Sequence, residues 1–351
     1  MLTDVIMGIR PLDYEAMRQA RERLDSLTKP LGSLGRLEEI AERVAGITGN
    51  PLPPVPRKTA ILLAADHGVV VEGVSAYPQE VTLQMLANFA GGGAGMNVLC
   101  RHAGIELWVV DIGVAADTRG MTGVSNRKVA CGTANMAAGP AMSRETALQA
   151  LETGVSLARE AVETGAGLLI TGEMGIGNTT PASALAAFYT GITPEEAVGS
   201  GSGINQERRQ NKIRAVAQAL EINKPDRNDP VDVVAKIGGL EIAGMAGIML
   251  AGAAGRVPVL VDGFISTAAA LVAAHLCPAV KDYLLGTHVS QEPAHRVMLE
   301  FLGLAPMLVM EMRLGEGTGA ALAAPVVDAA LKVLHEMATF GEAGVSKALD
   351  N

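Results

Sequence analysis

Six short apolar runs separated by helical stretches organise the middle of the chain. They are rich in Val, Ile, Leu and Ala and lie at 59–65, 107–112, 168–171, 257–261, 283–285 and 307–310. Continuous apolar runs of this kind are typical of strands in a parallel sheet that helices cover on both faces. The pattern predicts a doubly wound α/β fold with a mostly parallel six-stranded sheet.

Both ends of the chain have a helical period instead. Apolar residues recur at helical spacing among many charges between Leu12 and Ile47, and the stretch from Val326 to Met337 is again amphipathic. Lys29-Pro30-Leu31-Gly32 divides the first stretch, and a proline-rich connector at 49–56 follows it. We expect residues 1–55 and 325–351 to form one small helical domain beside a large α/β domain at 56–324.

Composition restricts the ligands to small molecules. The 351 residues carry a formal net charge of -9, with 3% aromatic residues and one tryptophan. Such a chain lacks the basic patches and stacking platforms that bind nucleic acids. The three cysteines are far apart, without zinc or disulfide spacing, and the apolar stretches are too short to span a membrane. We therefore expect a soluble cytoplasmic protein with no nucleic-acid or membrane partner.

An acid or a histidine follows each apolar run. These residues are Asp66 with His67, Asp111, Glu173, Asp262, His288, and Glu311 with Glu316. Each one alone could cap a helix or close a turn. Together they predict a ligand site, because the carboxyl ends of parallel strands meet at one edge of the sheet. No His-x-x-x-His pair or similar close spacing occurs, so we expect no metal site.

The segment from Leu168 to Ala184 predicts a phosphate-binding loop. An apolar strand leads into Gly175-Ile176-Gly177, and Thr180-Pro181 provides an N-cap and a first-turn proline for a following helix. Small residues allow close backbone approach, and the N–H groups and dipole of a helix N-terminus attract anions. A plain strand-to-helix turn explains the same pattern, and neither the Walker spacing nor the full dinucleotide fingerprint is present.

Other glycine-rich turns occur at 91–95, 199–203, 238–239 and 315–319. Lys212 follows the second of these and could place a cation near the phosphate loop, although a charged helix face is more often solvated. Glu316 lies between two glycines and could serve as a base or stabilise a cationic transition state. A surface turn glutamate fits the same pattern.

Several motifs together resemble the nicotinate-nucleotide:dimethylbenzimidazole phosphoribosyltransferase family, which activates the lower ligand of cobalamin. The likeness spans nearly the whole chain. It is carried by Thr28–Gly35, Asp66-His67-Gly68 with Pro78-Gln79-Glu80-Val81-Thr82, Gly172–Thr180, Asp262-Gly263-Phe264-Ile265-Ser266, Gly286-Thr287-His288 and Arg313-Leu314-Gly315-Glu316-Gly317.

The resemblance implies a reaction and assigns residues to it. The family moves 5-phosphoribosyl from nicotinate mononucleotide to 5,6-dimethylbenzimidazole, giving α-ribazole 5′-phosphate and nicotinate with inversion at the anomeric carbon. By resemblance, Glu316 is the general base. The resemblance assigns binding of the phosphate and ribose to Glu173, Gly175, Ile176, Gly177, Asn178 and Lys212. It assigns binding of the aromatic base to Tyr77, Pro78, Gln84, Met85, Leu314 and Gly315.

The resemblance also implies a homodimer without a metal or tightly held cofactor, in which the helical domain helps to close the neighbouring site. The acceptor could be dimethylbenzimidazole, another benzimidazole, adenine or a phenol. Two other functions stay open on the residues alone. One is NAD-dependent hydride transfer, which the incomplete dinucleotide motif disfavours. The other is a non-catalytic sensor of nucleotides or benzimidazoles.

Overall fold

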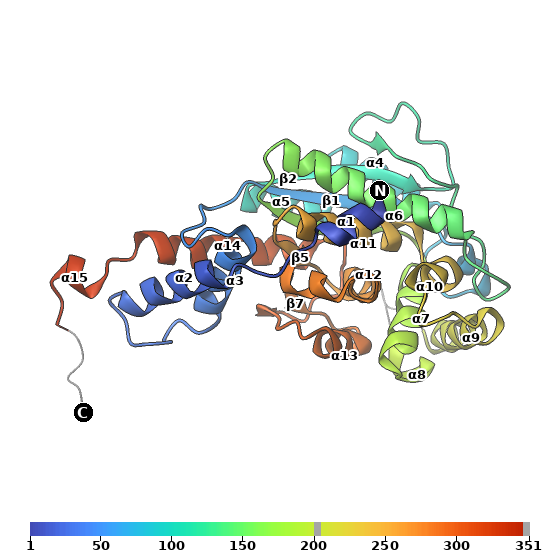
Figure 1. Cartoon of the computed structure of the whole chain (residues 1–351). Helices are drawn as coiled ribbons and strands as arrows, with labels where there is room; N and C mark the ends of the chain where they lie inside the picture. The colour runs from blue at the N-terminus through green and yellow to red at the C-terminus, as the bar shows by residue number, and fades with distance from the viewer. Residues whose placement is uncertain (200–204, 347–351) are drawn as a thin grey trace.

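A six-stranded parallel sheet forms the centre of the molecule (Figure 1), whose computed structural model describes residues 1–199 and 205–346. The strands are β1 (Lys58–Ala65), β2 (Ile105–Gly113), β3 (Ser125–Asn126), β4 (Leu168–Met174), β5 (Val259–Val261) and β6 (Leu284–Gly286). Their order is β3-β2-β1-β4-β5-β6, and every ladder is parallel. The sheet therefore winds outward from β1 in both directions, which confirms the predicted doubly wound α/β fold.

One predicted strand lies outside this sheet. Residues 307–310 contain β8 (Leu308–Val309), which pairs only with β7 (His288–Val289) in a separate two-stranded sheet. The sixth strand of the main sheet is instead β3, which pairs with the end of β2. Both residues of β3 are polar and exposed, so no apolar run marks it in the sequence.

Strand β1 shows why the apolar runs have no polar alternation. All eight of its residues are buried. Successive side chains of a strand point to opposite faces, so Ile61 and Leu63 enter one core while Leu62 and Ala64 enter the other. A central strand covered on both faces is therefore apolar along most of its length, here from Ala60 to Ala65.

Two groups of helices build these cores. The face with Ile61 is covered by α6 (Arg144–Glu163), α7 (Thr179–Thr190), α11 (Leu240–Ala254) and α12 (Phe264–Leu276). The face with Leu62 is covered by α3 (Arg36–Thr48), α4 (Val81–Ala90), α5 (Gly95–Ala103) and α14 (Thr318–Glu336).

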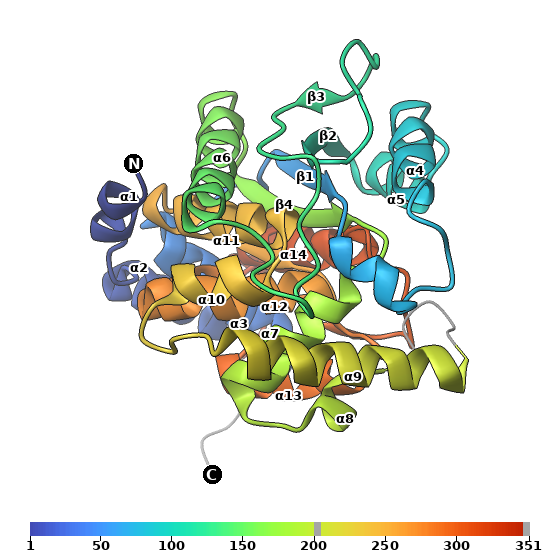
Figure 2. The same ribbon diagram turned by 90° about the vertical axis from the view of Figure 1, so that its right-hand side faces the viewer.

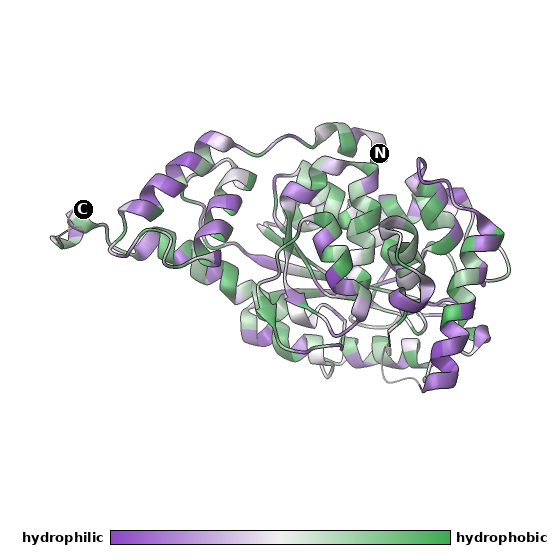
Figure 3. Ribbon diagram, turned by 90° about the horizontal axis from the view of Figure 1, so that it is seen from below, coloured by the Kyte–Doolittle hydropathy of each residue, from purple (hydrophilic) through white to green (hydrophobic). Residues whose placement is uncertain are grey.

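The remaining helices lie outside these layers. They are α1 (Leu2–Gly8), α2 (Tyr14–Ser26), α8 (Pro194–Ala197), α9 (Gln206–Asn223), α10 (Pro230–Ile237), α13 (Pro293–Leu302) and α15 (Phe340–Ala343), with short 3-10 helices at Gly68–Glu72 and Pro278–Tyr283. Figure 2 shows α9 running across the outside of α7, near α8 and α10. In Figure 3, hydrophilic residues colour much of the helices that protrude beside the C-terminus, and hydrophobic residues are frequent in the helices around the sheet. Within the described ranges, no helix is both long and apolar enough to cross a membrane.

Segments from near the two ends of the chain, α2 and α3 with α14, meet in a lobe at one side of the molecule (Figure 1). The predicted helices between residues 12 and 47 are confirmed as α2 and α3, with the break where Lys29-Pro30 occurs. Both helices pack against α14, and the Thr28 amide donates to the Ala338 carbonyl at 3.0 Å.

Two details of the chain ends differ from the predicted helical domain of residues 1–55 and 325–351. Helix α14 begins at Thr318, eight residues before the predicted start, and crosses the expected domain boundary at 325. Helix α1 packs against α6 and α11 of the main body rather than in the lobe. The division into domains 1–55 with 325–351 and 56–324 stays a prediction.

Candidate active site

A cavity of about 430 Å³ opens at the carboxyl edge of the sheet. It lies where β4 and β5 end and where the chain turns into α7, α12 and α14. Four of the acids and histidines predicted for this edge line it, namely Glu173, Asp262, His288 and Glu316. The strand order reverses between β1 and β4, and ligands in doubly wound sheets bind beside such a reversal.

The other predicted edge residues have structural partners elsewhere. Asp66 accepts the Ala115 amide at 2.8 Å, and Asp111 accepts the Val114 amide at 2.8 Å. His67 contacts Glu241 at 2.9 Å in the protein interior. These residues and Glu311 do not line the cavity, so the expectation of one cluster drawn from every strand is wrong for them. Asp66 and Asp111 instead hold connecting loops, which is the alternative role in a turn that the sequence left open for each of these residues.

The site residues assigned by resemblance come together with two exceptions. Those that line the cavity are Tyr77, Met85, Glu173, Gly175, Ile176, Gly177, Asn178, Lys212, Leu314, Gly315 and Glu316. Pro78 and Gln84 do not. Val81 and Met85, one helical turn apart on α4, face the cavity, whereas Gln84 lies about 100° around the helix from Met85 and is exposed.

Sequence reasoning missed part of the lining. Eight lining residues lie inside the family motifs but were given no role, namely Val81, Met174, Thr179, Gly263, Phe264, Ile265, Ser266 and Arg313. Their place in those motifs was the available signal. The further lining residues Val74, Ser75, Ser290 and Glu292 carry no pattern that sets them apart from packing or turn residues.

The loop between β4 and α7 has tight backbone geometry. Gly177 has a φ of 92°, and a methyl group added to Gly175 would lie 2.4 Å from the Ala65 carbonyl oxygen. Both positions therefore require glycine. Asn178 is the N-cap of α7, so the helix starts before the predicted cap at Thr180. The Ile176 amide donates to Thr82 Oγ1 at 3.1 Å, which ties the loop to α4.

Lys212 places a buried amine at the start of α7. It lies on α9, is 3% exposed, and donates from Nζ to Thr179 Oγ1 at 2.7 Å. Burial lowers the pKa of Lys212 to about 8, and the charge of Glu292 opposes that shift. A cation beside a helix N-terminus makes this corner of the cavity suited to an anion. The predicted glycine-rich turn at 199–203 lies, apart from Gly199, outside the described residues.

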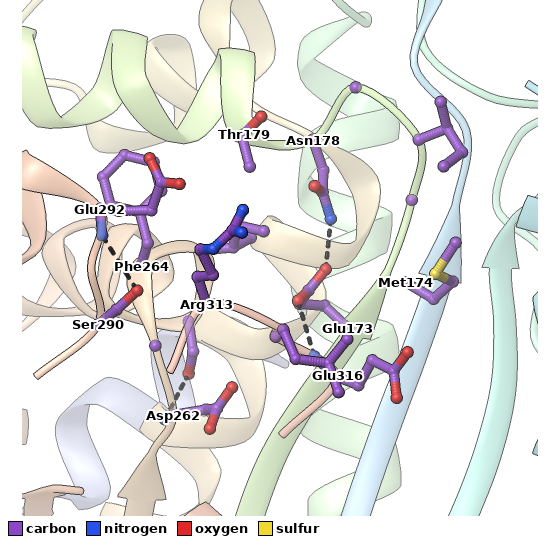
Figure 4. A pocket seen from close by; sticks show the side chains of 18 of the residues that line it. Glu173, Met174, Asn178, Thr179, Asp262, Phe264, Ser290, Glu292, Arg313 and Glu316 are labelled. Atoms are coloured by element: carbon purple, nitrogen blue, oxygen red, sulfur yellow. Dashed lines mark hydrogen bonds between the residues drawn. The ribbon is translucent and has the colours of Figure 1, made fainter. Parts of the chain in front are cut away.

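Glu173 links the loop to the turn that carries Glu316 (Figure 4). Its carboxyl group accepts the Asn178 side-chain amide on one oxygen and the Glu316 backbone amide, at 3.1 Å, on the other. Burial raises the pKa of Glu173 to about 8. The charges of Glu241 and Asp262 contribute to this rise, and the two donated hydrogen bonds oppose it.

Glu316 has an unusual backbone and an unpartnered carboxyl oxygen. Its φ is 65°, and the flanking Gly315 and Gly317 also have positive φ. The side chain is buried, and its Oε2 has no hydrogen-bond partner among the residues that the structure describes. Burial raises the pKa of Glu316; the Met96 amide lowers it, and the charge of Asp262 raises it. A carboxylate with raised basicity and an uncommitted oxygen can take a proton from a bound molecule.

Asp262 lies behind this turn. It accepts the Gly317 amide at 3.1 Å and the Ala320 amide at 2.9 Å, and the His288 ring is 4.0 Å away. Burial raises the pKa of Asp262, and His288 and the donated amides oppose that rise. In the part of the chain that the structure describes, no group of three His, Cys, Asp or Glu side chains could hold a metal ion.

Apolar side chains make up a further part of the cavity lining. They belong to Val74, Tyr77, Val81, Met85, Met174 and Leu314. An apolar wall facing a few convergent polar groups is typical of a small-molecule site. The arrangement combines an anion corner, a buried base and an apolar slot in one cavity.

Comparison with known proteins agrees with this chemistry. Residues 9–345 match a family model described as a phosphoribosyltransferase. The nicotinate-nucleotide–dimethylbenzimidazole phosphoribosyltransferase of Desulforamulus reducens is 56% identical over 348 residues, 99% of each chain. The Geobacter metallireducens protein of the same name is 54% identical over 350 residues, covering 100% of this chain and 99% of that relative.

A solved structure supports the same relationship. The crystal structure of the nicotinate-nucleotide–dimethylbenzimidazole phosphoribosyltransferase from Thermus thermophilus matches with a TM-score of 0.91 and 48% sequence identity. The match covers 96% of this chain and 100% of the other. On the full-length identity and the shared fold, the chain belongs to the family of nicotinate-nucleotide–dimethylbenzimidazole phosphoribosyltransferases.

Proposed function

We propose that this enzyme transfers 5-phosphoribosyl from nicotinate mononucleotide to 5,6-dimethylbenzimidazole during assembly of the cobalamin nucleotide loop. The observation that carries the proposal is that one cavity holds both the buried amine of Lys212 and Glu316, whose buried Oε2 has no partner in the described part of the chain. The reaction needs both features, since it binds a phosphate and removes a proton. The names of the relatives support the choice of donor and acceptor.

The 5′-phosphate binds at the start of α7. Lys212 provides the positive charge, Thr179 holds its amine, and the loop Gly175-Ile176-Gly177-Asn178 approaches the anion closely because of its glycines. The amides of Ile176 and Asn178 already donate within the protein, to Thr82 Oγ1 and to the Gly175 carbonyl. Lys212 and the helix dipole therefore carry most of the recognition.

The ribose then lies between the phosphate corner and Glu316. A ring nitrogen of the benzimidazole forms the new bond to the anomeric carbon as the bond to the nicotinate nitrogen breaks. That bonding pair goes to the pyridinium ring, which leaves as neutral-ring nicotinate. The other ring nitrogen of the acceptor becomes acidic, and Glu316 takes its proton. Glu173 lies beside the ribose and favours the oxocarbenium-like state electrostatically when it is ionised.

The acceptor occupies the apolar slot. Tyr77, Met85, Leu314 and Gly315 contact it, as the resemblance implied, and Val81 lies one turn from Met85 on the same wall. Pro78 and Gln84 are left out of this contact set. The chemistry calls for no metal or tightly bound cofactor, because the leaving group is already cationic and the base comes from the chain itself.

The enzyme works as a cytoplasmic homodimer, with the helical lobe of one subunit close to the site of the other. Three free cysteines fit a reducing compartment. Val309, Met310 and Leu314 expose apolar side chains at the rim of the site, as a subunit contact would use. Light scattering of the purified protein tests this assembly, and a mass of one chain would contradict it.

A product assay tests the activity directly. The purified protein is incubated with nicotinate mononucleotide and dimethylbenzimidazole, and the products are separated by chromatography with mass detection. We expect nicotinate and α-ribazole 5′-phosphate in equal amounts. Adenine, unsubstituted benzimidazole and a phenol are offered in parallel to rank the acceptors. Binding of both substrates without any product would favour a sensor instead.

A further inference from the structure

The turn that carries Glu316 holds a conformation that its own side chain does not favour. Gly315, Glu316 and Gly317 have φ angles of 84°, 65° and 96° in succession. Glycine adopts this left-handed region freely, whereas a glutamate stays there only where surrounding contacts hold it. The contacts around the turn therefore decide where the Glu316 carboxylate lies.

Two carboxylates from neighbouring strands provide those contacts. Glu173, near the end of β4, accepts the Glu316 amide. Asp262, directly after β5, accepts the Gly317 amide through Oδ2 and the Ala320 amide through Oδ1. Gly317 is the N-cap of α14 and Ala320 is in its first turn, so Asp262 fixes the helix end immediately behind Glu316.

The position of Asp262 is itself tightly determined. Its side chain is 2% exposed, and its backbone amide donates to Ser266 Oγ at 3.2 Å. The strand before it is fully buried between β4 and β6. A buried carboxylate with both oxygens engaged by backbone amides keeps one orientation, because rotation would break two charge-assisted hydrogen bonds.

We propose that Asp262 is a positioning residue for the transfer reaction, holding the Gly317 and Ala320 amides so that Glu316 is aimed into the cavity. This inference rests on the proposed role of Glu316 as the base. Asp262 acts through Glu316 and not on the substrate.

A double-mutant cycle tests the proposal. Asp262→Asn keeps one acceptor oxygen but presents an NH2 group to the other amide, so one of the two hydrogen bonds is lost. We expect kcat to fall about 10- to 100-fold, because a small displacement of a catalytic group is that costly. The Kd of nicotinate mononucleotide should change less than about threefold, because the substitution leaves the proposed phosphate site at Lys212 and the start of α7 unchanged.

The second side of the cycle is the Glu316→Gln background. There Asp262→Asn should cost less than about threefold more, because the group it positions no longer reacts. If Asp262→Asn lowers kcat by the same factor in the Glu316→Gln background as in the wild type, Asp262 acts independently of Glu316 and the proposal is overturned. Wild-type kcat in Asp262→Asn would overturn it too. Asp262→Glu, which keeps the charge but moves the carboxylate, should lose activity similarly and replaces Asp262→Asn if that variant does not fold.

A measurement without substrate separates this inference from the proposed function. Amide hydrogen exchange over residues 314–322 should be faster in Asp262→Asn than in wild type. Asp111→Asn is the matched control, because Asp111 is buried at the end of β2, accepts the Val114 amide, and does not line the cavity. Absence of product from the wild type would contradict the proposed function alone. Unchanged exchange over 314–322 would contradict the positioning role.

Discussion

The Glu316 amide donates a hydrogen bond of 3.1 Å to Oε1 of Glu173, although 143 residues separate the two in the sequence. The same Glu173 carboxyl group accepts the side chain of Asn178 at the start of α7. One buried acid thus connects the proposed phosphate corner to the proposed base. We expect a shift of the loop to reach Glu316 partly through this side chain.

Replacing Glu173 should therefore affect catalysis more than donor binding. Glu173→Gln presents an NH2 group to one of its two donors, so one hydrogen bond is lost. We expect kcat to fall about 10- to 100-fold, and the free energy of unfolding to fall by about 1–3 kcal/mol. Steady-state kinetics and chemical denaturation measure both. Glu160→Gln, at an exposed ion pair with Arg127, should leave kcat unchanged. If Glu173→Gln keeps the wild-type kcat, the hydrogen bonds of Glu173 to Asn178 and to the Glu316 amide play no part in catalysis.

Donor binding should weaken above the pKa of Lys212. The amine is protonated below about pH 8 and neutral above it, so kcat/KM for nicotinate mononucleotide should fall as pH rises through that value. A phosphate monoester with its second pKa near 6 is already a dianion there, so its own titration does not explain the fall. Lys212→Arg keeps its charge and should remove this limb of the profile. A limb that persists in Lys212→Arg would belong to another group.

The loop between β4 and α7 should not accept a side chain at Gly175. The methyl group of Gly175→Ala would lie 2.4 Å from the Ala65 carbonyl oxygen, so the loop must move away from β1. We expect nicotinate mononucleotide to bind at least about tenfold more weakly and unfolding free energy to fall by about 1–3 kcal/mol. Calorimetry measures the binding. Gly139→Ala is the control, because a methyl group there meets no atom within 4 Å. Equal affinity in both variants would contradict the proposed phosphate site.

The acceptor slot can be tested from one helix. Val81 of α4 lines the cavity, whereas Gln84 of the same helix is exposed and does not. Val81→Phe should raise the KM for dimethylbenzimidazole at least about tenfold, because overfilling a packed slot excludes the ring. The Kd of the donor should stay the same. Gln84→Phe should leave both constants unchanged. A larger effect from Gln84→Phe would place Gln84 against the acceptor, as the resemblance implied.

The sequence predicted the architecture well because β1, β2 and β4 are apolar along most of their length. It missed β3, whose two polar residues pair only through the backbone, and it assigned 307–310 to the wrong sheet. Strand partners depend on contacts that are distant in the sequence. A short run such as 308–309 carries no information about which strand it will join.

In the site too, local sequence patterns were predictable, whereas contacts between residues distant in the sequence were not. The glycine loop and Glu316 were visible as local patterns and as family motifs. The contacts of Glu173 and Asp262 with the Glu316 turn were not, because they join residues on different strands. The positive φ of Glu316 was also hidden, since a glutamate gives no sign of a left-handed backbone. The role of Gln84 stays a prediction, because resemblance alone does not say which face of α4 meets the cavity and Gln84 does not line it.

The central claim is that Glu316 is the base, and the pH dependence of kcat in Glu316→Gln tests it most directly. Burial raises the pKa of Glu316 above that of an ordinary glutamate, so wild-type kcat at saturating substrates should fall as pH drops through that pKa and the carboxylate protonates. The variant should bind nicotinate mononucleotide within about threefold of wild type, lose about 10²- to 10⁴-fold in kcat, and lack the acidic limb. A variant that keeps wild-type kcat and the same acidic limb would show that another group takes the proton.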